Sequence, residues 1–321
     1  MKLLILSLLF LAVFFGVPGC ISANKPKLPL LFIGEQSISK ARNLESNYSL
    51  SNIKISNSNY LRIDESFKYN EDFTYDCAKN NLYILKSIDN TVAKRVLDVL
   101  HYNKKGKLLI INSVPEMFDN ATSISIDWKK GKIYWVVRNR SYFSIKVTDR
   151  TFKNSNYVIL PEQTYIKKIQ VYPKQKQIFF SNGTHIFYTS NSPNSTAKLL
   201  FDSSVKLEGL ENFVIDYATD KLCWIADLKS WDALRCVDIS RLSQPLNSED
   251  IVIVEEDLLL RNTDLVAYNN TFYWTEIYLE NSLRLFTKKN NESYADVTVL
   301  PEEKRLLFIY PNCPATAAKN N

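Results

Sequence analysis

The chain has 321 residues, of which 45% are hydrophobic and 23% are charged, and its formal net charge at pH 7 is +6. This length fits one globular domain of moderate size. Basic residues are spread along the sequence and form neither an arm nor a stripe, which argues against a nucleic-acid-binding protein. A net charge of this size predicts only a mild attraction to acidic partners or anionic surfaces.

The N-terminus has the pattern of a secretory signal peptide. Lys2 precedes an apolar stretch over residues 3–15, which is too short to cross a membrane, and Ile21-Ser-Ala23 is a suitable cleavage site. We therefore assign residues 1–23 to a signal peptide and expect a secreted, extracellular protein. No later run reaches about 18 consecutive apolar residues, so we expect no membrane span.

Five segments further along the chain repeat one pattern, in which two apolar strands are joined by a short polar turn. They cover residues 73–84, 125–135, 170–180, 214–224 and 265–274. The positions that we take as equivalent lie 44 to 51 residues apart, and they are Asp76, Asp127, Tyr172, Asp216 and Ala267. Strand-forming repeats of this length predict the four-stranded blades of a β-propeller.

The two ends of the chain contain complementary parts of one further repeat. Leu307-Phe-Ile-Tyr-Pro311 resembles Ile169-Gln-Val-Tyr-Pro173, the first strand of a repeat, and residues 29–42 have the pattern of a second and a third strand. Pairing of these ends would remove two bare sheet edges. We predict an all-β, six-bladed propeller over residues 24–314, closed by its N- and C-terminal segments, and a disordered tail over residues 315–321. The alternative is a β-sandwich with accidental periodicity.

Four cysteines remain after removal of the signal peptide, and they allow three pairings. Cys223 and Cys236 lie on consecutive strands, and folding that hairpin about its middle places them within disulfide reach. A bond between Cys77 and Cys313 would join the first repeat to the closing strand. Its loop of more than 200 residues gives it roughly 5 kcal/mol in the chain-entropy model. The alternative is a set of buried thiols.

Seven glycosylation sequons support secretion, since composition alone accounts for about four. They begin at Asn47, Asn120, Asn139, Asn182, Asn194, Asn269 and Asn291.

The repeats resemble the class B, or YWTD, repeats of low-density-lipoprotein-receptor-type proteins. The resemblance covers residues 29–314 and implies a six-bladed propeller. Its strongest matches are Val214-Ile-Asp-Tyr-Ala-Thr-Asp-Lys-Leu-Cys-Trp-Ile-Ala-Asp227, Ala233-Leu-Arg-Cys-Val-Asp-Ile239 and Phe272-Tyr-Trp-Thr-Glu276. A second similarity, through Asn212-Phe-Val-Ile-Asp216 and Asn81-Leu-Tyr-Ile84, is to insect haemolymph propellers of the ommochrome-binding type, and it implies a small pigment as ligand.

The sequence carries little that indicates catalysis. Asp76, Asp127 and Asp216 recur at one repeat position, where a metal-dependent propeller hydrolase would gather calcium ligands. We interpret them instead as acceptors for backbone donors at the blade turns. The two histidines, His101 and His185, lie outside any nucleophile–base pattern. We therefore predict a protein that is not an enzyme and that needs no cofactor or metal.

The turns between second and third strands share a propeller face with the blade-to-blade connections, and that face normally receives ligands. Large aromatic residues at turn tips are poor core residues, and aromatics with arginine dominate binding hot spots. The predicted ligand-binding residues are Arg138, Arg140, Tyr142, Asp227, Trp231, Glu276 and Tyr278. An alternative for Trp231 is that it packs back onto its own hairpin.

These observations favour a monomeric extracellular protein that binds a protein or peptide through its turn face. The first alternative is a carrier that holds a pigment or another small hydrophobic ligand in the central channel. The second is a metal-dependent extracellular hydrolase.

Overall fold

The structure is a computed structural model. It describes residues 30–35, 60–62, 70–88, 94–102, 108–153, 157–163, 165–202, 205, 207, 210, 212–227, 232–242, 245–258, 262–277, 283–289, 296–300, 304–309 and 313. Over these residues the protein is built of strands, and the helical element among them is the single-turn 3₁₀ helix η3 (Ser248–Asp250). The all-β prediction is confirmed.

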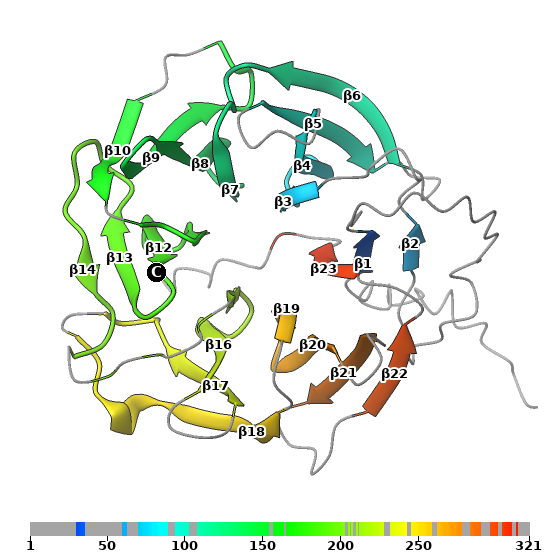
Figure 1. The fold of residues 1–321 in the computed structure, drawn as a ribbon, viewed down its shortest axis with the longest axis vertical. Coiled ribbons are helices and arrows are strands. Elements are labelled where there is room, and N and C mark those ends of the chain that lie inside the picture. Colours follow the sequence, from blue (N-terminus) through cyan, green and yellow to red (C-terminus); the bar gives the residue numbers. More distant parts are fainter. Residues whose placement is uncertain are drawn as a thin grey trace, which may run out of the picture.

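Five four-stranded antiparallel sheets surround a central channel as the blades of a propeller (Figure 1). In chain order their strands are β3 (Asn70–Asp76), β4 (Asn81–Ser87), β5 (Arg95–Tyr102) and β6 (Leu108–Pro115); β7 (Ala121–Asp127), β8 (Lys132–Asn139), β9 (Tyr142–Asp149) and β10 (Tyr157–Gln163); β11 (Lys168–Tyr172), β12 (Gln177–Ser181), β13 (Ile186–Ser190) and β14 (Lys198–Leu199); β15 (Phe213–Asp216), β16 (Lys221–Asp227), β17 (Asp232–Asp238) and β18 (Val252–Leu258); and β19 (Asn262–Tyr268), β20 (Thr271–Ile277), β21 (Leu283–Lys289) and β22 (Asp296–Leu300). A β-sandwich is excluded, because the first strand of every sheet faces the channel.

A three-stranded sheet lies between the first and the fifth of these sheets (Figure 1). It contains β1 (Leu30–Glu35), β2 (Tyr60–Arg62) and β23 (Lys304–Ile309) in the order β2-β1-β23. Strands β1 and β23 pair antiparallel, so that Phe32 stands opposite Leu307 and Phe308 stands opposite Leu31. Segments from the two ends of the chain therefore meet in one sheet, as the sequence predicted. The other neighbour of β1 is β2, which runs parallel to it, and not a third strand within residues 29–42, of which residues 36–42 lie outside the described residues.

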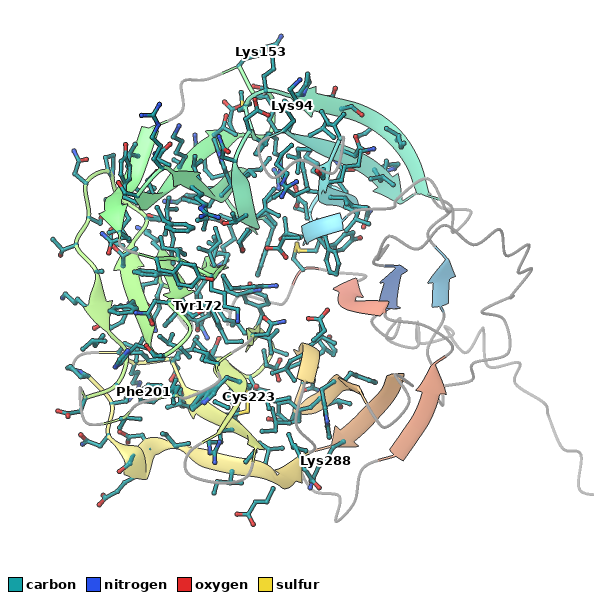
Figure 2. All side chains as sticks on the ribbon, in the orientation of Figure 1. Lys94, Lys153, Tyr172, Phe201, Cys223 and Lys288 are labelled. Carbon is teal, nitrogen blue, oxygen red and sulfur yellow. A yellow bond between two sulfur atoms is a disulfide. The ribbon has the colours of Figure 1, made fainter. Side chains whose placement is uncertain are left out.

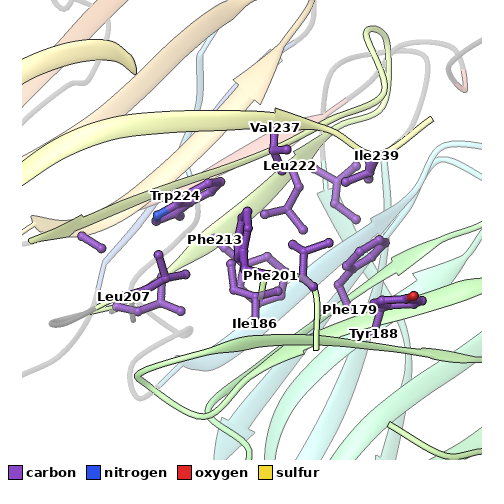
Figure 3. Packing of buried hydrophobic residues seen from close by; sticks show 14 of the residues in the cluster. Phe179, Ile186, Tyr188, Phe201, Leu207, Phe213, Leu222, Trp224, Val237 and Ile239 are labelled. Carbon is purple, nitrogen blue, oxygen red and sulfur yellow. The ribbon is translucent and has the colours of Figure 1, made fainter. Parts of the chain in front are cut away.

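The hydrophobic core consists of clusters between neighbouring sheets, because each twisted sheet buries both of its faces. Between the third and the fourth sheets, Phe179 and Ile186 meet Phe213 and Trp224, all at most 1% exposed (Figure 3). Similar clusters lie between the other consecutive four-stranded sheets. Aromatic residues on the second strands thus pack between blades, which accounts for much of the aromatic content.

The fifth repeat has a shorter turn than its alignment by sequence suggested. Tyr268 pairs with Thr271, so two residues, Asn269 and Asn270, form the hairpin loop, and both have positive φ (49° and 58°). Asparagine tolerates this conformation, which two-residue hairpin turns require. Tyr268, and not Ala267, therefore occupies the position equivalent to Asp216, and the predicted equivalence of Ala267 was wrong by one residue.

Both predicted disulfides are present. Cys223 and Cys236 face each other across β16 and β17, as the hairpin predicted. Cys77, in the turn after β3, is bonded to Cys313, 236 residues further along the chain, and their Cα atoms are 4.9 Å apart. Within the part of the chain described, no helix is long and apolar enough to cross a membrane. The predicted signal peptide and C-terminal tail lie outside the described residues.

Replacing Cys77 and Cys313 together by serine should lower the free energy of unfolding by up to about 5 kcal/mol, because the unfolded chain gains the freedom of a very long loop. Denaturant unfolding under non-reducing conditions measures this difference. Unchanged stability would show that the bond does not constrain the unfolded chain.

Candidate binding site

The inner strands enclose a small cup in the centre of the ring, with a volume of about 80 Å³. Its lining comes from all five four-stranded sheets and comprises Phe73, Thr74, Tyr75, Ile126, Trp128, Lys168, Gln170, Asn212, Phe213, Val214, Tyr217, Asp264, Leu265, Val266 and Ala267. Trp128 and Tyr217 form its floor, where their rings meet edge to face with centroids 4.6 Å apart. These two rings therefore narrow the described part of the channel at the end where the inner strands lead into their turns.

The opposite end of the cup, its mouth, carries one polar residue from each four-stranded sheet. These residues lie four positions before the last residue of each inner strand, and they are Asp72, Ser123, Lys168, Asn212 and Asp264. Sequence reasoning missed this set because the five residues differ in type. The signal that could have found them is position, since each lies in or just before an inner strand at the same distance from the turn.

Asp72 joins three sheets at the mouth. One carboxylate oxygen accepts hydrogen bonds from Ser123 Oγ (2.6 Å) and from the Ile124 N–H (2.9 Å), and the other pairs with Lys168 Nζ (3.2 Å). The carboxylate is 3% exposed, so these donors replace its lost hydration. Ser123 Oγ in turn accepts from the Ile169 N–H at 3.2 Å, which continues the network into the third sheet.

A second contact crosses the mouth between the fourth and fifth sheets. Asn212 Nδ2 donates to Asp264 Oδ1 at 2.7 Å, and the Leu265 N–H donates to the same oxygen at 3.0 Å. Asn212 Oδ1 is buried and accepts no hydrogen bond within the described structure. The residues that line the mouth thus include the ammonium of Lys168, the carboxylate of Asp264 and the buried amide of Asn212.

The three recurring aspartates lie at the floor end of the ring and bind backbone, as the sequence interpretation held. Asp216 is the clearest case: it accepts from the Ala218 N–H (3.1 Å) in its own turn and from the N–H groups of Asn269 (2.9 Å) and Asn270 (2.8 Å) in the next sheet. Asp76 pairs with Arg150 Nε at 2.5 Å and accepts from the Ala78 N–H at 3.0 Å. Asp216 and Asp76 therefore each join one blade to the next.

Asp127 is the least compensated of the three. Its Oδ1 accepts from the N–H groups of Lys129 (3.0 Å) and Lys130 (3.1 Å), whereas its buried Oδ2 has no hydrogen-bond partner within the described structure. Burial raises the pKa of Asp127 above its ordinary value, and the two N–H groups oppose that shift. Burial, with the charge of Asp127 adding to it, also raises the pKa of Tyr217, whose hydroxyl donates to the Val171 carbonyl at 2.9 Å.

The residues predicted to bind ligand are only partly brought together by the described structure. Arg138 and Arg140 are exposed at the β8–β9 turn, and Tyr142, the first residue of β9, is 37% exposed. Asp227 and Glu276 end or nearly end strands β16 and β20, but their side chains, together with Trp231 and Tyr278, lie outside the described residues. The structure therefore places three of the seven at one turn.

Tyr165 is an exposed aromatic residue that sequence reasoning missed. It lies in the connection between β10 and β11, is 46% exposed, and packs edge to face on Phe143 with ring centroids 5.1 Å apart. The connection between β10 and β11 lies on the same face of the ring as the β8–β9 turn. Tyr165 and Tyr142 therefore lie on one face of the propeller. Only the tertiary position of this connection distinguishes Tyr165 from the many aromatic core residues.

The sequons that the structure describes lie at turns or strand ends, at Asn120, Asn139, Asn182, Asn194 and Asn269. Those at Asn47 and Asn291 lie outside the described residues. Asn139 pairs with Tyr142 across the β8–β9 hairpin, so a glycan on it would stand beside the exposed arginines. Asn182 Oδ1 accepts from the N–H groups of Thr184 and His185, at 3.1 and 2.9 Å.

Both histidines make local contacts. His101 Nδ1 lies 2.9 Å from Asn81 Oδ1 on the neighbouring strand, and His185 Nδ1 lies 2.9 Å from the Thr184 hydroxyl. Over the described residues, no three His, Cys, Asp or Glu side chains gather in a metal-binding arrangement.

Comparisons with known proteins show the fold. No protein-family model and no curated protein matches the chain. The nidogen/laminin complex contains a chain that superposes with a TM-score of 0.57 at 13% identity, over 76% of this chain and 86% of that one. TolB from Acinetobacter baumannii gives 0.54 at 11%, over 73% and 56%, and the GH74 enzyme of Niastella koreensis gives 0.50 at 9%, over 72% and 38%. At these identities, the likeness supports a β-propeller and no particular activity.

Replacing Asp72 by alanine should lower the free energy of unfolding by about 3 kcal/mol, because Lys168 Nζ and the Ile124 N–H lose their buried acceptor. Glu249→Ala, at an exposed position, should change it by less than about 0.5 kcal/mol. Denaturant unfolding compares the two. Equal effects would contradict the role given to Asp72.

Replacing Asp127 by asparagine should make stability less dependent on pH. Folding favours protonated Asp127, so the wild type loses stability as pH rises from the unfolded pKa, about 3.9, through the higher folded pKa. The stability of the variant relative to the wild type should therefore increase from about pH 4 to pH 7, by about 1.4 kcal/mol for each unit of pKa elevation. Parallel stability–pH curves would contradict this account.

Proposed function

We propose that the chain is an extracellular, non-enzymatic binding protein, a divergent relative of the class B repeat propellers, which binds a protein or peptide on the face that carries Tyr142 and Tyr165. Two disulfides support the extracellular assignment, because such bonds persist in oxidising compartments.

We also propose that the three-stranded sheet is the sixth blade and closes the ring. Strand β23 lies beside β19 on one side and β3 on the other, which is the place of an inner strand (Figure 1). The Cys77–Cys313 bond ties the chain beyond β23 to the first four-stranded sheet. A closed ring holds the turns of its blades in fixed relative positions, as a rigid binding face requires.

The exposed aromatic and arginine residues of the second sheet carry the functional proposal. Tyr142 and Tyr165 expose 37% and 46% of their surface, and Arg138 and Arg140 are exposed at the adjacent turn. Tyrosine and arginine are enriched in binding hot spots because they offer large contact areas with polar ends. The contact of Tyr165 with Phe143 restricts its ring before any partner arrives, which lowers the entropic cost of binding.

The size of the cup favours this face over the channel as the place of binding. Pockets for drug-sized ligands measure roughly 300–1,000 Å³, whereas the cup has about 80 Å³. A pigment of the kind bound by ommochrome-binding proteins would need a larger cavity, so the carrier function is the second candidate. The matching chain of the nidogen/laminin complex supports a protein partner only by analogy, since that chain is part of a protein complex.

A capture experiment with matched variants tests the proposal. Immobilised wild-type protein is exposed to the extracellular fluid of its source, and retained proteins are identified by mass spectrometry. A true partner should bind the double variant Tyr142→Ser/Tyr165→Ser at least about tenfold more weakly. Val252→Ser, at an apolar residue 56% exposed on the outer strand β18, should bind as the wild type does.

Two results would contradict the assignment. A partner whose affinity is the same for the double variant would place binding elsewhere on the molecule. A chromophore visible in the absorption spectrum of the purified native protein, with no retained protein, would favour the carrier.

A further inference from the structure

The floor side of the propeller collects exposed lysines that are far apart in the sequence. The turns β3–β4, β7–β8 and β11–β12 contribute Lys79, Lys129, Lys130, Lys174 and Lys176, all of them exposed. We call these five residues the basic face. Every inner strand runs from the mouth of the cup to its floor, so these turns lie on one side of the ring, opposite Tyr142 and Tyr165.

Arg150 holds two of these turns together. Its side chain pairs with Asp76 before the β3–β4 turn and donates from Nη2 to the Trp128 carbonyl in the β7–β8 turn at 2.9 Å. Its own N–H donates to the Gly131 carbonyl at 3.1 Å. Gly131 has φ of +64°, and a Cβ there would lie 2.7 Å from Arg150 Nη1, so a larger residue would displace the guanidinium from these contacts. These contacts fix the relative positions of the two turns that carry Lys79, Lys129 and Lys130.

The buried aspartates of this side do little to neutralise the basic face. Asp76 is fully buried and paired with Arg150, and Asp127 is fully buried and bound to backbone N–H groups. Asp220 accepts from Lys174 and from the Tyr172 hydroxyl, so Lys174 is compensated. No ion pair between described residues involves Lys79, Lys129, Lys130 or Lys176. Four ammonium groups therefore face solvent, and Lys153 extends the positive charge to the outer rim (Figure 2).

We propose that the basic face binds a sulfated glycosaminoglycan. Ammonium groups spread over adjacent blades suit a linear polyanion, which can follow the ring from turn to turn. A membrane or single-stranded nucleic acid would favour exposed apolar or aromatic residues for insertion or stacking. The exposed large hydrophobic residues of the described structure lie outside the three turns that form the basic face. Trp128, the aromatic residue beside Lys129 and Lys130, is 8% exposed and packs on Tyr217.

Heparin binding, measured by affinity against sodium chloride concentration, tests this proposal. The wild type should bind heparin at about 0.15 M salt, and its affinity should fall as salt rises because counterions are released. Lys129→Ser/Lys130→Ser should bind about tenfold more weakly, and the slope of log affinity against log salt should decrease by about two. Lys94→Ser/Lys198→Ser removes the same charge from exposed positions outside the basic face and should bind as the wild type does.

Three outcomes would overturn the proposal. Equal weakening in both variants would mean that net charge alone attracts heparin. Unchanged binding by Lys129→Ser/Lys130→Ser would exclude the basic face. Binding to phosphatidylserine vesicles or to a single-stranded oligonucleotide as tight as to heparin, and lost in the same variant, would assign the face to a membrane or to nucleic acid. The test is independent of Tyr142 and Tyr165, so it can fail while the proposed function stands.

Discussion

The interaction on which the described structure depends is the pairing of β1 with β23, which brings segments from the two ends of the chain into one sheet. Without it, the edges of both strands would expose unpaired backbone groups and invite edge-to-edge association. The two strands pair antiparallel, from Leu30 opposite Ile309 to Glu35 opposite Lys304. The disulfide from Cys77 to Cys313 then links the segment after β23 to the first four-stranded sheet.

Between the blades, apolar packing supplies the bulk of the contact and a few buried polar residues fix the register. Phe179, Phe213 and Trp224 are fully buried where two sheets meet, but apolar surfaces of this kind have little directional preference. Asp72 and Asp216 add direction, because each binds N–H groups of a neighbouring sheet. Asp76 likewise joins the first sheet to the second through Arg150, so hydrogen bonds and ion pairs account for the roles of these three aspartates.

The fold could be predicted from the sequence because its signals are periodic and local. Repeated strand–turn–strand segments indicated the blades, and the partial repeats at the two ends indicated where they meet. The hairpin with Cys223 and Cys236 was predictable from its symmetry. Ala267 was misaligned because a two-residue asparagine turn replaces the longer turn of other repeats, and the strand pattern alone does not show this change.

The candidate sites were less predictable because they are formed by residues from different repeats. The mouth combines Asp72, Lys168 and Asn212, which have neither type nor sequence neighbourhood in common. The basic face is similar: the lysines are evenly spread in the sequence, and three turns bring them to one side. The exposure of Tyr165 was not predictable either, because it depends on the tertiary position of the connection between β10 and β11.

Hydrogen exchange of the closing strands tests the central claim most directly. If the two ends zip together, amides in residues 30–35 and 304–309 of the intact protein exchange slowly, and Phe32→Pro speeds exchange in residues 304–309 while leaving β12 unchanged. Rapid exchange of residues 304–309 in the wild type, or no response to Phe32→Pro, would contradict the pairing of β1 with β23.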